Sequence, residues 1–379
     1  MDFSLTKQET LFLQMIREFA EKEVKPLAAE VDEQERFPEE TVAKMAKLGI
    51  MGIPVPVEYG GAGSTNQMYS MCVEELSRAC ATTGIVVSAH TSLCCAPIME
   101  HGTEEQKKKY LPKLASGEWL GAFGLTEPNA GTDAASQQTI AVEDGDSYIL
   151  NGTKIFITNA NYAHVFIDFA MTDKSQGVKG ITAFIVTRDM PGFSIGKKEL
   201  KMGIRGSATA ELIFENVRVP KENILGKVGG GFKVAMMTLD GGRIGVASQA
   251  LGIAQGAMDE TVKYTKERKQ FGKALAKFQN TQFQLADLET KVQAARLLVR
   301  NAAYKKDLHV DFSKDAAMAK LFAAETAMEV TTKAVQLHGG YGYTREYPVE
   351  RMMRDAKITE IYEGTSEVQR MVIAGKLFK

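Results

Sequence analysis

The sequence predicts a mostly helical protein of 379 residues with a β domain in its middle. Three observations predict this fold class. Apolar residues recur at three- and four-residue steps in the first and last thirds. Short β-branched or aromatic runs, bounded by Gly, Asp and Pro, fill the stretch between them. No proline interrupts the chain between Pro220 and Pro348. We therefore expect an N-terminal helical domain (1–120), a middle antiparallel β-barrel or sandwich (121–232) and a C-terminal four-helix bundle (233–379).

The N-terminal domain carries explicit helix start and stop signals. Thr6-x-x-Glu9 is a capping box that opens an amphipathic helix. Pro54, Pro56 and the glycines of 60–63 break the helical pattern into a loop. Three further helices are expected, at Met68–Ala79, around Gly84–Met99, and at Thr103–Leu114 with Thr103 as its cap.

The middle domain is predicted from short strands. Asn151-Gly152 stands between Tyr148–Leu150 and Ile155–Ile157, which predicts a tight hairpin because both residues tolerate positive φ. Further strands are expected at Val165–Ala170, Ile181–Val186 and Glu211–Phe214. Neither a G-x-G-x-x-G nor a G-x-x-x-x-G-K-[ST] motif occurs, which argues against a nicotinamide Rossmann domain and a P-loop.

The last third is expected to form long antiparallel helices, because Lys273 to His338 holds neither proline nor glycine. Apolar residues follow helical spacing in two groups. The first group is Leu285, Leu288, Val292, Ala295 and Val299, and the second is Met318, Leu321, Phe322 and Met328.

Composition excludes several classes of function. The 46 basic and 47 acidic residues leave no electrostatic footprint for nucleic acid or an anionic membrane. No run approaches 18 uninterrupted apolar residues, so we expect no membrane insertion. The first nine residues are too polar for a secretory signal, and four cysteines in one short region without a C-x-x-C pair favour reduced thiols and a cytoplasmic location. None of the five histidines completes an E-x-x-H or H-E-x-x-H pattern, so no metal is expected.

The stretch Lys357–Gln369 is the most informative candidate site. Glu363 precedes the final helix, for which Thr365 or Ser366 is the expected N-cap, and Gly364 leaves the adjacent backbone bare. A carboxylate beside an accessible N–H can remove a proton next to a carbonyl while the N–H holds the developing oxyanion. The alternative is that Glu363 only complements the helix N-terminus.

Four other segments are weaker candidates when each is taken alone. The loop Leu125–Asp133 can present backbone N–H groups to a polar ring or phosphate, or simply enter the β domain. Asp240 and Arg243, three residues apart, can form a surface ion pair. The remaining two segments are Arg268–Gly272 and Gln336–Gly342, where the glycines can be a helix C-cap.

Taken together, these segments resemble the acyl-CoA dehydrogenase family over essentially the whole chain. The resemblance is carried, in the family's order and spacing, by Gly124–Asp133, Asn151–Asn159, Arg268–Gly272, Gln336–Gly342 and Ile361–Gln369. It is greatest for the short-chain, butyryl-CoA branch of anaerobic bacteria, notably through Thr238–Val246.

The resemblance implies one FAD per subunit, a homotetramer built as a dimer of dimers, and electron exchange with an electron-transferring flavoprotein. Glu363 would take the α-proton of an acyl-CoA, the β-hydrogen would leave as hydride to flavin N5, and trans-2-enoyl-CoA would form. The Glu363 N–H and a ribityl hydroxyl of FAD would hold the thioester oxygen. The residues expected at FAD, partly across a subunit interface, are Phe123, Leu125, Thr126, Thr132, Phe156, Ile157, Thr158, Arg268, Gln270, Phe271, Gln279, Gln336, Leu337, Gly339, Gly340, Thr365, Ser366 and Glu367. Those expected at the CoA thioester are Thr132, Asp240, Arg243 and Gly364.

Departures from the family pattern refine this expectation. Some branches place the base one residue before Arg243, where this chain has Gly242, so the base is assigned to Glu363 and the substrate to the straight-chain class. Phe156 stands where many members have Trp, and Thr132 where many have Ser. His338 replaces an apolar residue, and the turn Asn159–Tyr162 replaces a glycine-bearing one.

Three alternative functions stay open from the sequence. The enzyme can act mainly as a 2-enoyl-CoA reductase on a bulkier, aryl-acrylyl type thioester in complex with the flavoprotein. It can be an acyl-CoA oxidase that passes electrons to oxygen. It can also be a non-catalytic acyl-CoA-binding subunit, although an intact Glu363 argues against this.

Overall fold

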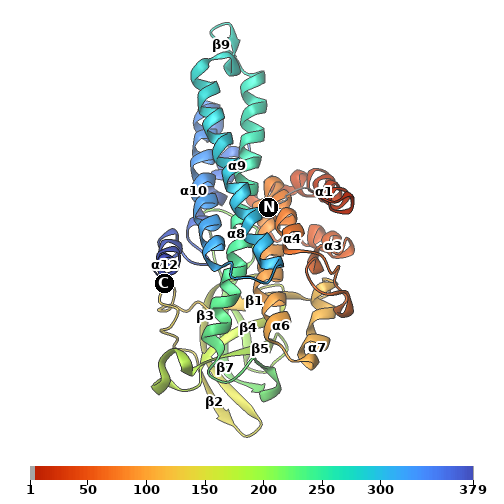
Figure 1. The fold of residues 1–379 in the computed structure, drawn as a ribbon, viewed down its shortest axis with the longest axis vertical. Helices are drawn as coiled ribbons and strands as arrows, with labels where there is room; N and C mark the ends of the chain where they lie inside the picture. The colour runs from red at the N-terminus through yellow and green to blue at the C-terminus, as the bar shows by residue number, and fades with distance from the viewer. Residues whose placement is uncertain (1–4, 379) are drawn as a thin grey trace.

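The computed structural model describes residues 5–378; residues 1–4 and 379, and with them the start of the polar N-terminal segment, lie outside the described part. The molecule is elongated (Figure 1), with a column of long helices at one end and the β domain at the other. The N-terminal helices pack beside the junction of the two. The predicted order of helical domain, β domain and helical domain is confirmed.

Short helices build the N-terminal part. The capping box predicted at Thr6 and the cap predicted at Thr103 are both present, and Thr103 also forms a capping box; each threonine hydroxyl accepts a backbone N–H at 3.2 Å. The elements are α1 (Lys7–Phe19), η1 (Ala20–Val24), η2 (Lys25–Leu27), α2 (Ala28–Glu33), α3 (Glu39–Lys47), η3 (Ile50–Gly52), η4 (Val57–Tyr59), α4 (Asn66–Ala79), α5 (Ala81–Ala89), η5 (His90–Cys95), α6 (Ala96–His101) and α7 (Glu104–Ala115).

The segments α5, η5 and α6 form one helix, Ala81–His101, that has a π-helical turn at η5. By length and composition alone this helix could cross a membrane. In the fold it is a core helix, because 94% of its most apolar window is buried inside the protein. Its position matters for the site, because η5 contacts both the first strand and the segment that carries Glu363.

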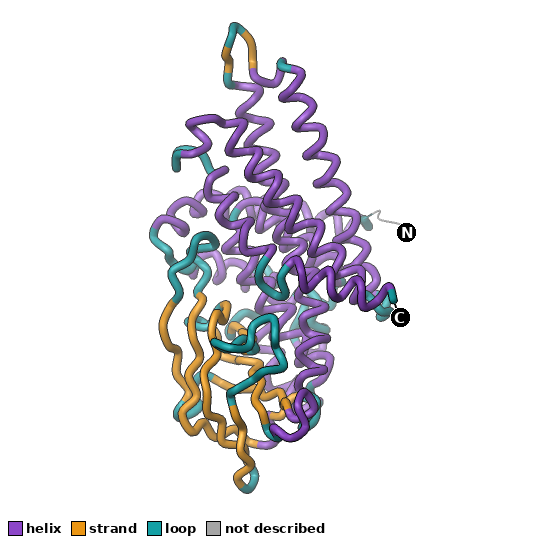
Figure 2. The backbone as a smooth tube through the Cα atoms, turned by 90° about the vertical axis from the view of Figure 1, so that its left-hand side faces the viewer, coloured by secondary structure: helices purple, strands orange, loops and turns teal. Residues whose placement is uncertain are grey.

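An eight-stranded sheet forms the middle domain, in the order β6-β7-β3-β2-β4-β5-β8, with β1 paired to β4. Most pairings are antiparallel, as predicted, but β1 and β2 run parallel to β4. The strands are β1 (Leu120–Gly124), β2 (Ile140–Asp144), β3 (Ser147–Thr158), β4 (Ala163–Met171), β5 (Ile181–Thr187), β6 (Phe193–Lys198), β7 (Thr209–Pro220) and β8 (Ile224–Leu225). The smooth backbone view (Figure 2) shows these strands curving around one another below the helices. Two short turns, η6 (Lys174–Gly180) and η7 (Lys221–Asn223), connect strands.

The hairpin predicted at Asn151-Gly152 is wrong. β3 runs straight through these residues, and the register against β7 shifts between Leu150 and Gly152. Gly152 has φ of +153°, and a Cβ at this position would lie 2.4 Å from the Thr139 hydroxyl oxygen. The glycine is therefore required by a bulge and a close approach, which produce the same sequence signal as a turn.

The C-terminal part is dominated by three long helices, which form the column in Figure 1. These are α8 (Gly231–Glu267), α9 (Gln279–Asp307) and α10 (Ser313–His338). The hairpin of β9 (Lys269–Gln270) and β10 (Lys273–Ala274), followed by η8 (Leu275–Lys277), lies at the outer tip between α8 and α9. The chain ends with η9 (Gly339–Tyr343), α11 (Val349–Lys357), η10 (Ile358–Glu360) and α12 (Ser366–Leu377), of which α11 and α12 pack against α10.

Alanines form the buried face of α10. The stripe predicted for α9 is confirmed, since Leu288, Val292, Ala295 and Val299 are buried. For α10 the prediction selected the wrong face, because Met318, Leu321 and Met328 are only partly buried and Phe322 is exposed. The buried residues are instead small ones at helical spacing, including Ala316, Ala319, Ala323 and Ala327. Small side chains allow α10 to approach the glycine- and alanine-rich middle of α8 closely.

Candidate active site

Glu363 occupies a strained turn between η10 and α12. Its φ is +53° and that of Gly364 is +94°, so two consecutive residues adopt the left-handed conformation that a side chain disfavours. Thr365 caps α12, as predicted, by accepting the Val368 N–H at 3.3 Å. The cap begins the helix immediately after the turn and leaves the Glu363 side chain pointing back into the protein.

Glu363 is partly buried, and one oxygen of its carboxylate is buried without a hydrogen-bond partner in the described part of the chain. Among the described residues its Oε2 atom has no hydrogen-bond donor and no exposed surface. Burial raises the pKa of Glu363 to about 7, even though Lys320 and Arg243 lower it by their charge. A buried carboxylate that titrates near neutral pH is suited to take up and release a proton.

Gly242 of α8 makes room for this carboxylate. A Cβ built on Gly242 would lie 2.2 Å from Glu363 Oε2 and 2.8 Å from Leu93 Cδ2 of the π-helical turn. The space next to Arg243 can therefore hold the Glu363 carboxylate or a side chain on residue 242, but not both. The observed position of Glu363 therefore requires glycine at position 242 for steric reasons.

Asp240 and Arg243 do form an ion pair, but the surface location that the sequence left open for it is wrong. Arg243 has 6% of its side chain exposed and Asp240 has 22%. Arg243 donates to Asp240, and the Ser313 hydroxyl of α10 donates to the same carboxylate at 3.0 Å. The Arg243 Nε–H has no partner among the described residues. The pair thus places a buried donor one residue from Gly242, next to the Glu363 carboxylate.

The predicted ring-binding residues of the β domain come together where β1 and β3 end. Leu125 and Thr126 follow β1, and the Ile155 N–H donates to the Thr126 carbonyl at 2.9 Å. Phe156 has φ of +59° and is 59% exposed, whereas Ile157 is buried and Thr158 is partly buried. Phe123 is partly buried on β1, and Thr132 lies exposed in the following loop.

A buried ionic network holds this loop on the β domain. Glu127 and Lys154, with 2% and 0% of their side chains exposed, form an ion pair at 2.7 Å. Lys154 also donates to Gln137 at 2.5 Å, and Glu127 accepts the Thr139 N–H at 3.1 Å. Nearby Asp168 is fully buried with both oxygens unpaired, and burial raises its pKa to about 8. The sequence motif contained Glu127, but nothing local to it indicated that Lys154 would pair with it.

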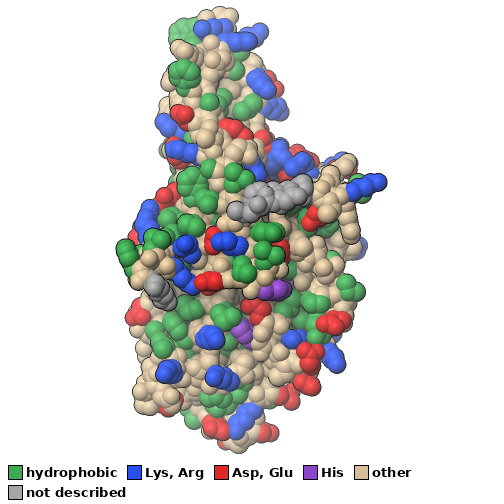
Figure 3. Space-filling view, in the orientation of Figure 1, with side chains coloured by type: hydrophobic (Ala, Val, Ile, Leu, Met, Phe, Trp, Pro, Cys, Tyr) green, Lys and Arg blue, Asp and Glu red, His purple; other side chains and the backbone are tan. Residues whose placement is uncertain are grey.

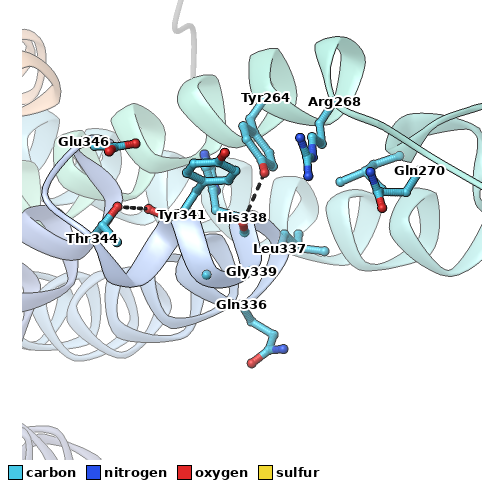
Figure 4. A pocket seen from close by; sticks show the side chains of 12 residues that line it. Tyr264, Arg268, Gln270, Gln336, Leu337, His338, Gly339, Tyr341, Thr344 and Glu346 are labelled. Atoms are coloured by element: carbon cyan, nitrogen blue, oxygen red, sulfur yellow. Dashed lines mark hydrogen bonds between the residues drawn. The ribbon is translucent and has the colours of Figure 1, made fainter.

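A second cluster lies at the far end of α8, around a pocket of about 480 Å³. Figure 4 shows Tyr264, Arg268 and Gln270 on one side of it and Leu337, His338 and Gly339 on the other. Six of the predicted cofactor residues line this pocket, namely Arg268, Gln270, Gln336, Leu337, Gly339 and Gly340. Phe271 and Gln279 do not line it; Phe271 is 94% exposed at the hairpin tip. His338 is buried beneath the pocket, stacked on Tyr264 at 4.2 Å between ring centroids.

The two clusters lie far apart within one chain. Tyr264 follows Gly242 by 22 residues on the same helix, which is roughly 33 Å at 1.5 Å per residue. The remaining predicted contacts, Thr365, Ser366 and Glu367, lie at the start of α12 beside Glu363. The pocket and the Glu363 turn are therefore separate regions of one chain.

Comparison with known proteins places this geometry in a family. Models of the N-terminal, middle and C-terminal domains of acyl-CoA dehydrogenase match residues 6–118, 122–217 and 229–378. The chain belongs to the acyl-CoA dehydrogenase family. The predicted resemblance to the short-chain branch is confirmed: the chain is 62% identical, over the whole of both chains, to the short-chain specific acyl-CoA dehydrogenase of Clostridium acetobutylicum.

Two further relatives bear on substrate and partner. The 3-(aryl)acrylate reductase of Clostridium sporogenes is 54% identical, with 99% of each chain covered. A chain in the structure that describes the electron transferring flavoprotein of Acidaminococcus fermentans, in connection with flavin-based electron bifurcation, is 57% identical, with a TM-score of 0.99 and complete coverage of both chains.

Acyl-CoA dehydrogenases are FAD-dependent oxidoreductases, and the residues of this chain fit that cofactor. At the pocket, a Cβ on Gly339 or Gly340 would meet nothing within 4 Å, so their backbone is open to a ligand. Arg268 lies over the Tyr341 ring, 5.5 Å from its centroid, and supplies a cation for a pyrophosphate. Phe156, Phe271 and Glu363 are among the few non-glycine residues with positive φ, a strain that clusters at functional sites.

Two residues that support Glu363 were missed by the sequence reasoning. Lys320 of α10 and Gln369 of α12 both donate to the Gly364 carbonyl. The sequence contained a signal for Lys320: it is a lysine at a position within the run of alanines that α10 buries. Within residues 5–378, no group of three or more His, Cys, Asp or Glu side chains is arranged to hold a metal ion.

Replacing Gly242 with alanine should separate activity from stability. The Cβ must displace the Glu363 carboxylate, so turnover should fall at least tenfold, while the helix itself should gain up to about 1 kcal/mol from the better helix former. Steady-state kinetics and thermal unfolding measure the two effects. Gly375→Ala is the control, because its Cβ would point into open space on α12. Full activity in Gly242→Ala would contradict the observed Glu363 position.

The buried network of the β domain predicts opposite effects for two isosteric changes. Glu127→Gln leaves Lys154 buried without its counter-charge and should cost about 3 kcal/mol. Asp168 instead has a pKa that is higher in the folded than in the unfolded state, so its contribution to stability is lost as pH rises from about 4 to 8. Asp168→Asn should therefore unfold at the same or a higher temperature than the native protein at pH 8. Thermal unfolding at pH 6 and pH 8 checks both, and equal destabilisation by the two changes would contradict this account.

Proposed function

We propose that Glu363 is the base of a short-chain acyl-CoA dehydrogenase that interconverts acyl-CoA and trans-2-enoyl-CoA. The observation that carries this proposal is the buried, partner-free Oε2 of Glu363, held against Gly242 with a pKa near 7. A base that removes a weakly acidic α-proton needs a desolvated carboxylate, because burial makes it more basic. The alternative from sequence was that Glu363 only complements the helix N-terminus; the burial of its Oε2 against Gly242 favours the base instead.

The other residues of this site bind and orient the substrate. The Glu363 N–H supports the thioester oxygen, and the left-handed turn directs it away from the helix ladder of α12. Arg243, Asp240, Thr132 and Gly364 are proposed to contact the CoA thioester. Bound FAD supplies the acceptor for the two electrons and the hydrogen that leave the β-carbon. Phe123, Leu125, Thr126 and Phe156 to Thr158 hold its ring system, with Thr126 and Thr158 hydrogen-bonding it.

The FAD site is proposed to be completed by a second subunit. Tyr264, which lines the pocket with Arg268 and Gln336, lies about 33 Å along α8 from Gly242, the residue beside Glu363, so the pocket is proposed to serve the site of a neighbouring chain. Apolar side chains that a monomer leaves exposed support such assembly; they are Phe271, Phe283, Leu297, Phe322, Met371 and Phe378. Figure 3 shows hydrophobic and basic side chains gathered at the tip of the helical column. We propose the homotetramer that the family resemblance implies.

An electron-transferring flavoprotein is the proposed redox partner. The near-identical fold of the chain found with the Acidaminococcus flavoprotein supports this assignment. The free, buried state of Cys72, Cys80, Cys94 and Cys95 supports a reducing, cytoplasmic setting.

The second candidate function is reduction of a bulkier aryl-acrylyl type CoA thioester, which the aryl-acrylate reductase relative favours. The Asn159–Tyr162 turn gives this candidate no support. Tyr162 stacks on Phe37 at 4.0 Å and donates to Glu39, while Asn159 donates to the Val86 and Gly121 carbonyls. The turn therefore ties β3 to neighbouring segments. Rates with butyryl-, crotonyl- and cinnamoyl-type thioesters, measured with the flavoprotein, distinguish the two functions.

Glu363→Gln should retain FAD and lose roughly a hundred- to ten-thousandfold in turnover, because the general base is absent. In the native enzyme, kcat/KM should rise with pH through about 7, since the base acts when ionised. Flavin absorbance, substrate-driven flavin bleaching under argon and pH–rate profiles are the measurements. Substantial turnover by the variant would move the base elsewhere. Bleaching by the native enzyme argues against a non-catalytic subunit, and stoichiometric peroxide release would indicate an oxidase.

Subunit mixing tests the shared cofactor site. A chain with Glu363→Gln and a chain with both Arg268→Ala and Gln336→Ala should each form an inactive enzyme. A hybrid pair should recover one intact site, because the unchanged Glu363 of one chain meets the unchanged pocket of the other. Activity of co-expressed, separately tagged chains is the measurement. Verified hybrids without activity would show that each site belongs to a single chain.

A further inference from the structure

Lys320 is a fully buried lysine whose charge no ion pair explains. It lies on α10 with none of its side chain exposed, between the small residues Ala319 and Ala323. Lysines are almost never buried completely unless they are paired, because the ammonium loses its hydration. Among the described residues, its Nζ makes a single hydrogen bond, to the Gly364 carbonyl at 2.7 Å. The hydrogen bond of Lys320 is therefore made to the turn that carries Glu363.

Gln369 of α12 donates to the same carbonyl. Its side chain is also fully buried. Its Nε2 lies 2.8 Å from the backbone carbonyl oxygen of Gly364 and 3.5 Å from the backbone carbonyl oxygen of Glu363. Donors from two helices thus hold the one peptide at which the backbone is left-handed on two consecutive residues. Fixing this carbonyl fixes the direction in which the Glu363 side chain leaves the turn.

The two donors differ in charge. Lys320 lowers the pKa of Glu363 more than any other neighbouring group, against the larger effect of burial. Arg243 of α8 acts in the same direction, but it is already paired with the Asp240 carboxylate. The other titratable groups that face Glu363 are the buried phenols of Tyr69 on α4 and Tyr362 beside it. Glu360 and Glu367 also act on Lys320. Lys320 is therefore the cation whose charge is available to Glu363.

We propose that Lys320 is a positioning residue for Glu363: its ammonium holds the Gly364 carbonyl and supplies the positive charge against which the buried carboxylate ionises. Gln369 also holds the Gly364 carbonyl, but it supplies no positive charge. The proposal rests on Glu363 acting as the base, and it names what sets the pH at which that base works.

Lys320→Met and Gln369→Met each remove one donor to the same carbonyl, and only the first removes a charge. Both should lower kcat. Lys320→Met should also move the acidic limb of the kcat/KM profile upward by about one pH unit or more, so that much of the activity lost at pH 7 returns at higher pH. Gln369→Met should leave the limb in place. Lys320→Arg keeps the charge and should restore the native limb even where kcat stays low.

A direct titration accompanies the kinetics. The infrared C=O stretch of protonated Glu363 is identified in the holoenzyme as the band missing from Glu363→Gln, and it should persist to higher pH in Lys320→Met. If Lys320→Met does not assemble, Lys320→Gln, which retains a hydrogen-bond donor without the charge, takes its place. An unmoved band and limb in the Lys320 variants, or an equal shift in Gln369→Met, would overturn the proposal. Full turnover by Glu363→Gln would instead overturn the assignment of the base itself.

Discussion

The approach of the Glu363 carboxylate to Gly242 is the contact on which the rest of the site depends. It requires a residue without a side chain on α8, a left-handed turn before α12 and a π-helical turn that brings Leu93 against the same point. Water is excluded from one carboxylate oxygen as a result, and its pKa rises toward neutrality. The basicity of the group is thus a product of packing among three segments distant in sequence.

Small residues make this packing possible. α8 and α10 meet through alanines and glycines, so the two helices lie close enough for Lys320 to reach Gly364 from one side while Gly242 faces Glu363 from the other. Larger residues on either face would separate the helices and admit water to the carboxylate. Because the buried face of α10 is made of small residues, its bulkier apolar side chains, such as Phe322, lie on the outer face, where they are available to a neighbouring subunit.

The length of α8 separates the chemistry from the nucleotide pocket. A straight helix holds Gly242 and Tyr264 about 33 Å apart, and in the proposed enzyme each site is completed by a second chain. Assembly and cofactor binding are therefore coupled in the proposed enzyme. The β domain contributes a third, rigid part, since the Glu127–Lys154 pair ties the loop after β1 to β3.

Local sequence determined those features that depend on neighbours along the chain. The caps at Thr6, Thr103 and Thr365 and the long helices α9 and α10 could be predicted, because hydrogen bonds and periodicity within a few residues specify them. The site motifs were found through the family resemblance and not from local rules. Only the tertiary structure decided that Asn151-Gly152 is a bulge, that α10 buries alanines, and that Asp240 and Arg243 lie inside the protein. It alone showed that Lys320 and Gln369 hold the Gly364 carbonyl and that Gly242 lies against the Glu363 carboxylate. The reason is that packing and desolvation depend on which residues meet in space, and the sequence order of three distant segments does not contain that information.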